Sequence, residues 1–360
     1  MAYYFLTASK DASVYLQQPN QNTGLDEILE VSKVYYGNTK DVAHSLIKFE
    51  VGFLSASISN NTKKLQEATL IMREAQSEEI PLKYTIFAHA ISGSWEMGIG
   101  SRFDTITTKG VTWNYREGDT KLNWLDNNFQ SYTTASVSDG SGGTFYIYHT
   151  ASQNFDYQKG DIEMNVTPIL KSWMSGSLNG GIPNDGFILK YEGAKELDTE
   201  DYGIVRLFSK ETFTIYQPKI RIGWDDQIFQ TGSLLPLNST ELKVSVKNFK
   251  KEYKKETKNK LKVFGRELYP LKTFTNKFSY DDVKYLPQNS YFQIKDFSSD
   301  DIIIPFSNYS KINCNSNGNY IELDFSNWEA NRTYKIEFKI DMGGEIQYFD
   351  NDLTFFLVAN

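Results

Sequence analysis

Hydrophobic and polar residues alternate along much of this chain. In residues 334–340, aromatic and aliphatic side chains at the even positions alternate with lysine and glutamate at the odd positions. A period of two places each set on its own face of a β-strand. The pattern therefore predicts a strand with one buried face and one face in water.

Similar short runs rich in Val, Ile, Thr, Tyr and Phe recur, each closed by Gly, Asn, Asp or Pro. This spacing is typical of the strands of a β-sandwich rather than of βαβ units. The predicted strands are residues 83–90, 143–149, 186–191, 203–209, 218–224, 291–294, 302–306, 320–325 and 353–358.

One segment has a helical pattern instead. Val166, Ile169, Leu170 and Trp173 fall on one face of a helix over residues 165–175, and a proline lies near its start. Proline is favoured in the first turn of a helix, where its missing N–H costs nothing. We expect a short helix that covers one end of a sandwich.

The residue composition of the chain changes after Asp226. Turn-forming residues dominate positions 229–241, and new strand material begins at Leu242. A length of 360 residues is enough for two β domains that each bury a core, and the 15% aromatic content favours sheets. We therefore predict one domain at residues 1–228, a linker at 229–241 and a second domain at 242–360.

Charge does not point to nucleic acid. The net charge is -7, so the chain as a whole is acidic. Residues 248–262 carry seven lysines, which could indicate a nucleic-acid patch, but Glu252 and Glu256 interrupt them. A solvated strand or loop is the preferred interpretation, and no direct role in nucleic-acid binding is expected.

The sequence contains few of the residue motifs that enzymes use for catalysis. Cys314 is the one cysteine, and it lies in a Ser/Asn/Gly-rich stretch without a nearby base. His44, His89 and His149 form no zinc-binding motif, and the glycines of residues 139–143 lack the lysine of a phosphate-binding loop. We expect no enzyme activity, no cofactor and no metal site.

Six tryptophans raise the alternative of a sugar-binding surface. An exposed indole can stack on a sugar ring, and Trp113 and Trp124 are the candidate glycan-binding or interface aromatics. Core or interface packing is the preferred interpretation, because tryptophan buries a large area and needs only one polar partner. A polysaccharide depolymerase is a third hypothesis, which requires two carboxylates near each other in a cleft.

No run of 18 apolar residues occurs, and the first residues lack the basic and apolar regions of a signal peptide. We therefore expect no membrane partner and no secretion.

Roughly the first 226 residues resemble the DNRLRE-type β-sandwich found in bacterial surface proteins and in structural proteins of tailed phages. The eponymous motif of that family is replaced here by residues 41–46. The segments that carry the resemblance are residues 10–15, 21–30, 45–49, 94–98, 110–113, 166–173, 184–190, 208–212 and 218–226.

The remainder of the chain resembles the immunoglobulin-like C-terminal part of structural proteins from large phages. The resembling segments are residues 264–270, 286–296, 303–306 and 332–338. Together the two resemblances imply an all-β protein, with an N-terminal jelly-roll-like β-sandwich and a C-terminal immunoglobulin-like β-sandwich.

The resemblances also imply a function in assembly rather than catalysis. We expect a virion protein of a tailed phage, assembled in the host cytoplasm, at the neck, the head-tail connector or the tail. Its partners would be other virion proteins and further copies of itself in a closed ring, because identical head-to-tail contacts close when the rotation permits. The alternative is a carbohydrate-binding module of a host-recognition fibre.

Overall fold

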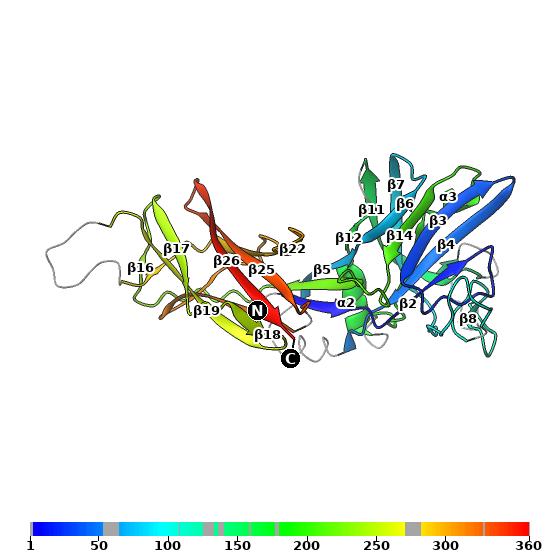
Figure 1. Cartoon of the computed structure of the whole chain (residues 1–360), viewed down its shortest axis with the longest axis horizontal. Coiled ribbons are helices and arrows are strands. Elements are labelled where there is room, and N and C mark those ends of the chain that lie inside the picture. The colour runs from blue at the N-terminus through cyan, green and yellow to red at the C-terminus, as the bar shows by residue number, and fades with distance from the viewer. Residues whose placement is uncertain are drawn as a thin grey trace. The chain divides into compact units, whose positions relative to one another are not determined.

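A computed structural model of the chain describes residues 3–52, 65–107, 109–124, 133–135, 140–157, 160–176, 180–270, 282–326 and 328–359. The chain forms two compact units, whose strands are labelled in Figure 1. The N-terminal unit is Leu6–Ile222, and the C-terminal unit joins Gly223–Asn360 with the first residues, Met1–Phe5. Residues 229–241, expected to be a linker, lie within the C-terminal unit, where Phe229 bridges to Cys314.

Strands dominate the first part of the chain. In order, the elements up to the unit boundary are β1 (Tyr3–Thr7), β2 (Lys10–Tyr15), β3 (Ile28–Tyr36), β4 (Thr39–Lys48), β5 (Leu65–Met72), β6 (Glu74–Glu78), β7 (Lys83–Ile91), β8 (Tyr115–Glu117), β9 (Leu122–Asn123), β10 (Thr133–Ala135), β11 (Thr144–Asp156), β12 (Ile162–Asn165), α2 (Thr167–Ser175), β13 (Phe187–Tyr191), α3 (Gly193–Leu197), β14 (Gly203–Phe208) and β15 (Lys219–Trp224).

The largest sheet of the chain lies in the N-terminal unit. It has the order β10-β11-β7-β13-β4-β3-β14-β6, with β2 also paired to β4. A smaller sheet has the order β1-β15-β5-β12, and the division between the units falls within β1 and β15. Both faces of the larger sheet are buried at its centre. Ile188 pairs with Leu46 on one face and Phe187 pairs with Ile47 on the other, and none of the four is exposed. The sheet therefore has a core on each side.

The second core includes residues from the segment between β7 and β11. Trp95, Trp113 and Trp124 pack there against strand residues that include Val42, Leu46 and Ile188. The described part of this segment also forms the small β8-β9 sheet, so the second face of the large sheet is covered mainly by connecting residues.

The C-terminal unit is a two-sheet sandwich. Its elements are β16 (Leu235–Pro236), β17 (Leu242–Lys247), β18 (Glu252–Lys254), β19 (Lys258–Glu267), β20 (Lys284–Tyr285), β21 (Ser290–Asp296), β22 (Ile302–Ile304), β23 (Asn313–Asn315), β24 (Gly318–Asp324), β25 (Arg332–Asp341) and β26 (Ile346–Val358).

One sheet has the order β17-β19-β24-β23 and the other β18-β26-β25-β21-β22. A shared core contains Val263 and Ile321 of the first sheet and Ile294 and Phe338 of the second. The predicted alternation in residues 334–340 is confirmed, because the even positions of β25 are buried and the odd ones are partly exposed. The expected all-β sandwich fold is confirmed.

Two finer predictions are also confirmed. The expected helix is α2, with Ile169, Leu170 and Trp173 buried and proline in its first turn. The lysine-rich segment contains β18 and β19, and it is a solvated strand where Lys258 and Lys260 pair with carboxylates of β24.

Candidate interaction surface

The two tryptophans proposed from the sequence as glycan or interface aromatics are not surface residues. Trp113 and Trp124 are each 3% exposed. The ring of Trp113 lies 4.9 Å from that of His44, and Trp124 donates its indole N–H to the Thr112 carbonyl at 3.2 Å. Their rings fill the second core of the large sheet, so the expectation of a stacking surface at these positions is wrong.

A buried polar cluster lies next to Trp113. Glu196 of α3 accepts a hydrogen bond from Lys190 of β13 at 2.6 Å, and its other oxygen lies 3.0 Å from His44 Nε2. His44 Nδ1 lies 2.7 Å from the Gly142 carbonyl. Lys190, Glu196 and His44 are all at most 4% exposed. The cluster joins β4 to β13 and to α3, the short helix that directly follows β13.

The electrostatics of this cluster favour a structural role. Burial alone would raise the pKa of Glu196, but His44 and Lys190 outweigh it and hold the pKa at about 2. Burial also lowers the pKa of Lys190. Each oxygen of the Glu196 carboxylate has a partner, and the side chain is 4% exposed, so the group is not presented to solvent. We conclude that these groups tie α3 to the sheet.

Of the remaining candidates for chemistry, Cys314 is buried and His149 is partly exposed. Cys314 is buried in β23, and burial raises the pKa of its thiol, which disfavours the thiolate. His149 shares a hydrogen bond of 3.0 Å with Ser172. Among the described residues, no three His, Cys, Asp or Glu side chains form a group that could hold a metal ion. Within the same part of the chain, no helix is long and apolar enough to cross a membrane.

Three exposed large apolar residues lie in one short segment, residues 98–107, which we call the Phe103 loop. Phe103 is 90% exposed, Ile106 68% and Ile99 59%. Large apolar side chains at such exposure are informative when they gather on one short segment. The loop therefore presents an apolar tip to solvent.

A buried asparagine fixes the base of the Phe103 loop. Asn22 donates to the carbonyls of Met97 and Val111, both at 2.8 Å, and accepts from the Gly100 N–H at 2.7 Å. Gly98 has φ +83°, and a Cβ there would lie 2.3 Å from Asn22 Oδ1. The glycine lets the backbone pass over the amide, so the loop is held by a specific polar anchor.

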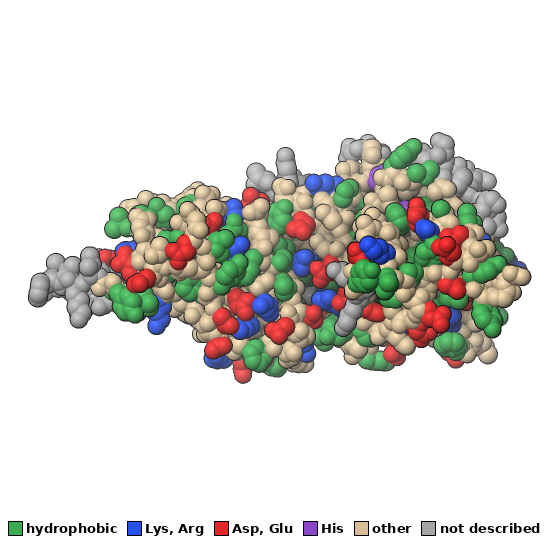
Figure 2. Space-filling model, turned by 90° about the horizontal axis from the view of Figure 1, so that it is seen from above, with side chains coloured by type: hydrophobic (Ala, Val, Ile, Leu, Met, Phe, Trp, Pro, Cys, Tyr) green, Lys and Arg blue, Asp and Glu red, His purple; other side chains and the backbone are tan. Residues whose placement is uncertain are grey.

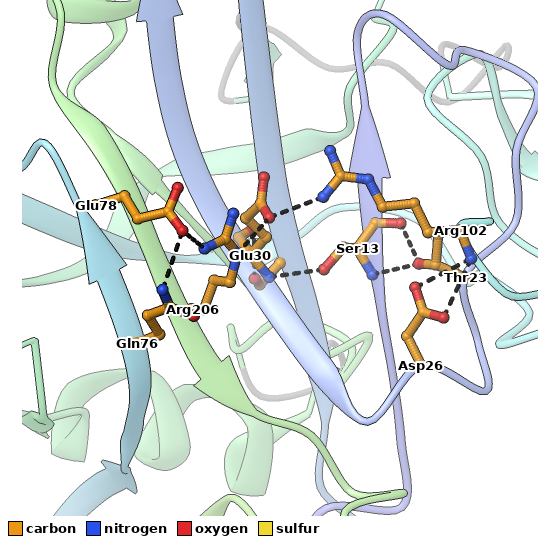
Figure 3. A network of polar contacts seen from close by, with 9 residues as sticks. Ser13, Thr23, Asp26, Glu30, Gln76, Glu78, Arg102 and Arg206 are labelled. Atoms are coloured by element: carbon orange, nitrogen blue, oxygen red, sulfur yellow. Dashed lines mark hydrogen bonds and ion pairs between the residues drawn. The ribbon is translucent and has the colours of Figure 1, made fainter.

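A charged network fixes the middle of the same loop (Figure 3). Arg102 donates to Glu30 of β3 at 2.9 Å, and Arg206 of β14 approaches the same carboxylate oxygen at 3.3 Å. Arg206 continues to Glu78 of β6 at 2.5 Å. The guanidinium of Arg102 also lies 4.0 Å from the ring centre of Tyr15. These contacts hold Arg102 inward while its neighbour Phe103 remains in solvent.

A second loop is anchored beside the first. Phe213, in residues 209–217, is 92% exposed. The Asp26 carboxylate accepts a hydrogen bond from the Arg102 N–H at 3.1 Å, and the Asp26 carbonyl accepts one from the Ser209 hydroxyl at 2.6 Å. Both loops are therefore anchored to the same residue.

We call the exposed side chains of these loops, with the adjacent exposed Leu25, the Phe103–Phe213 surface. It consists of Leu25, Ile99, Phe103, Ile106 and Phe213.

On the face drawn in Figure 2, hydrophobic side chains lie among acidic and basic side chains rather than in one continuous area. The Phe103 loop was not predicted from the sequence, because its residues follow neither a period of two nor a helical period. The signal that could have found it is the pair Gly98 and Gly100 beside Phe103, since glycines mark tight backbone turns.

Comparisons with known proteins add no family to this picture. No protein-family model matches the chain. A search of curated proteins likewise finds no significant match.

The buried titratable groups predict a specific pH dependence of stability. Burial lowers the pKa of His89 to about 3, and its ring stacks 4.3 Å from that of Phe145. Between pH 3 and about 6.5 the unfolded chain therefore binds a proton that the folded protein does not, so this group destabilises the fold as the pH falls. We compare the free energy of unfolding of His89→Phe with that of the wild type, measured by urea unfolding. The difference should favour the variant by roughly 2 kcal/mol more at pH 4 than at pH 7.

Asp11 supplies the opposite sign as a control. Burial raises its pKa to about 7, so the stability contributed by the protonated carboxyl group is fully present below pH 3.8 and is lost as the pH rises through 7. The wild type should lose this contribution between pH 4 and 7, and Asp11→Asn should not show that loss.

Equal pH profiles for wild type and His89→Phe would show that His89 is not buried in its neutral form.

Proposed function

We propose that this chain is a non-enzymatic structural protein of a tailed bacteriophage particle, which acts through protein-protein contacts at the Phe103–Phe213 surface. The observation that carries the proposal is the combination of two phenylalanines about nine-tenths exposed with loops fixed by buried polar anchors. Loops that are already ordered lose little conformational entropy on binding, so their apolar side chains can contribute fully to affinity.

The distribution of polar groups supports assembly over catalysis. The buried cluster of Lys190, Glu196 and His44 and the network of Arg102, Glu30 and Arg206 both connect separate elements of the sheet. Aromatic side chains at the surface are the type of residue that dominates the energetics of protein interfaces.

The assignment to a phage particle rests on the sequence resemblances of both halves. The two-unit all-β architecture is compatible with that assignment and does not distinguish it from other β-sandwich proteins. Within the particle we propose a closed ring of identical copies at the neck or tail, with heterologous contacts between neighbours.

Substitution at the proposed contact tests the function directly. The double variant Phe103→Ser with Ile106→Ser is expected to fold but to enter purified particles at least about tenfold less than the wild type, because it removes the apolar tip. Quantitative mass spectrometry of particles, with the variant supplied as the source of the protein, measures incorporation.

Tyr36→Ser is the matched control, because Tyr36 is also highly exposed but lies at the end of β3, outside the proposed surface. Normal incorporation of the double variant would contradict the proposed surface. Absence of the wild-type chain from purified particles would contradict the proposed function itself.

A further inference from the structure

A row of alternating lysines and tyrosines crosses the outer face of the five-stranded sheet in the C-terminal unit. Tyr291 of β21 pairs with Lys311 on one side and with Lys339 of β25 on the other, and Lys339 pairs with Tyr348 of β26. Residues directly opposite each other in antiparallel strands point to the same face. The order Lys311, Tyr291, Lys339, Tyr348 therefore spans about 14 Å perpendicular to the strands.

The row lies on the solvent side of the sheet. Phe338 and Ile340, which flank Lys339 in the sequence, are fully buried in the core, so Lys339 points away from it. Tyr348 is 66% exposed. A third ring, Phe306, lies 5.8 Å from Tyr348. Aromatic surface and positive charge are therefore available together to a ligand.

The two lysines of the row differ from their neighbours in having no acidic partner. In the adjacent rows, Lys295 pairs with Glu337 at 3.0 Å and Lys335 pairs with Asp350 at 2.5 Å. Lys339 instead lies 5.6 Å from the ring centre of Tyr291 and 6.0 Å from that of Tyr348. Among the described residues, neither Lys339 nor Lys311 has a carboxylate within ion-pair distance.

The acids near the row leave it with a net positive charge. Glu337 and Asp350 are paired with the neighbouring Lys295 and Lys335. Asp341 is two residues from Lys339 on the same strand; its carboxylate accepts the Gly343 N–H at 2.9 Å in the turn before β26 and keeps its negative charge. This one charge offsets only one of the two lysines of the row, although the whole chain carries -7.

We propose that this row, Lys311, Tyr291, Lys339 and Tyr348, is a binding site for an acidic saccharide, and that it is independent of the proposed assembly surface. The C–H face of a pyranose ring matches the apolar face of tyrosine, and a uronate or similar carboxylate matches an unpaired ammonium group. The phenol hydroxyls of the tyrosines supply polar contacts at the rim of the same rings.

Charge density favours a saccharide over single-stranded nucleic acid. Affinity for nucleic acid depends on the number of phosphates that the protein neutralises, and this row offers two cations on an acidic protein. A saccharide whose acid groups are uronates or sialates carries at most one carboxylate on each ring and presents sugar faces between the charges. The spacing of lysines between tyrosines suits that pattern.

Binding of the full-length chain to defined oligosaccharides tests the proposal. The probes are oligosaccharides of polygalacturonate, hyaluronate and polysialate, with methyl-esterified polygalacturonate as the neutral counterpart and oligo(dT) as the nucleic-acid comparison. Calorimetric titration at low salt is expected to show binding of at least one acidic probe, weakened by added salt, and weaker binding of the neutral counterpart.

Variants locate the site. Tyr348→Ala is expected to weaken binding about tenfold, which corresponds to about 1.4 kcal/mol. Lys339→Gln should abolish the preference for the acid over its methyl ester. Lys260→Gln is the matched control, because Lys260 also lies over a tyrosine ring, at 3.4 Å from the centre of Tyr320, but pairs with Glu322 on the other sheet. Unchanged thermal unfolding of each variant shows that its fold is retained.

Four results would overturn the proposal. These are no binding of any acidic probe, equal binding of acid and ester, binding that survives both Tyr348→Ala and Lys339→Gln, and binding of oligo(dT) alone. None of these outcomes concerns the Phe103–Phe213 surface, so the proposed assembly function is tested separately.

Discussion

Glu196→Ala is expected to lower the free energy of unfolding by about 3–5 kcal/mol, because it leaves two buried partners without their carboxylate. Lys190 and His44 are almost completely buried, and each directs a nitrogen atom at Glu196. Removal of the carboxylate leaves the ammonium group of Lys190 uncompensated beside the aromatic ring of Phe145. Chemical unfolding at pH 7 measures the change.

The matched control is Glu192→Ala at the start of α3. Glu192 is exposed, and its side chain makes no capping hydrogen bond to the helix. We expect this variant to change stability by less than about 0.5 kcal/mol. A loss below about 1 kcal/mol for Glu196→Ala would contradict the view that the cluster ties α3 to the sheet.

Asn22→Ala is expected to cost about 2–4 kcal/mol and to loosen the Phe103 loop. The substitution removes hydrogen bonds to the carbonyls of Met97 and Val111 and from the N–H of Gly100. Each buried backbone group that loses its partner costs free energy. Amide hydrogen exchange at Gly100 and Leu25 should accelerate, because Leu25 N–H donates to the Gly100 carbonyl at 2.9 Å.

Asn20→Ala provides the comparison two residues earlier. Its side chain is exposed and accepts one hydrogen bond, from Asn114 at 3.0 Å. We expect little change in stability or exchange. Retention of slow exchange in Asn22→Ala would mean that the loop does not depend on this anchor, and the argument from a pre-ordered contact surface would fail.

The fold was predictable where burial follows a simple period. In β25 and α2 the alternating and helical patterns predicted the element and its buried face, because one face of each contacts a core. The pattern could not predict that the central strands of the large sheet are buried on both faces. Lys190 on β13 is an example, since a lysine in a strand normally suggests a wet face.

The candidate surfaces were much less predictable. Trp113 and Trp124 were chosen for residue type, but burial in a second core depends on residues distant in the sequence, such as Leu46 and Ile188. The Phe103 loop depends on hydrogen bonds from Asn22, and the row through Lys339 depends on strand register. Neither long-range hydrogen bonds nor register leaves a periodic signal in one sequence.

We propose that this chain acts as a structural protein through the Phe103–Phe213 surface, and cryo-electron microscopy of purified phage particles can show that surface in place. We expect a closed ring of identical copies in which Phe103 and Phe213 are buried against a neighbouring subunit. Particles that lack the chain, or a map in which both side chains remain in solvent, would contradict it.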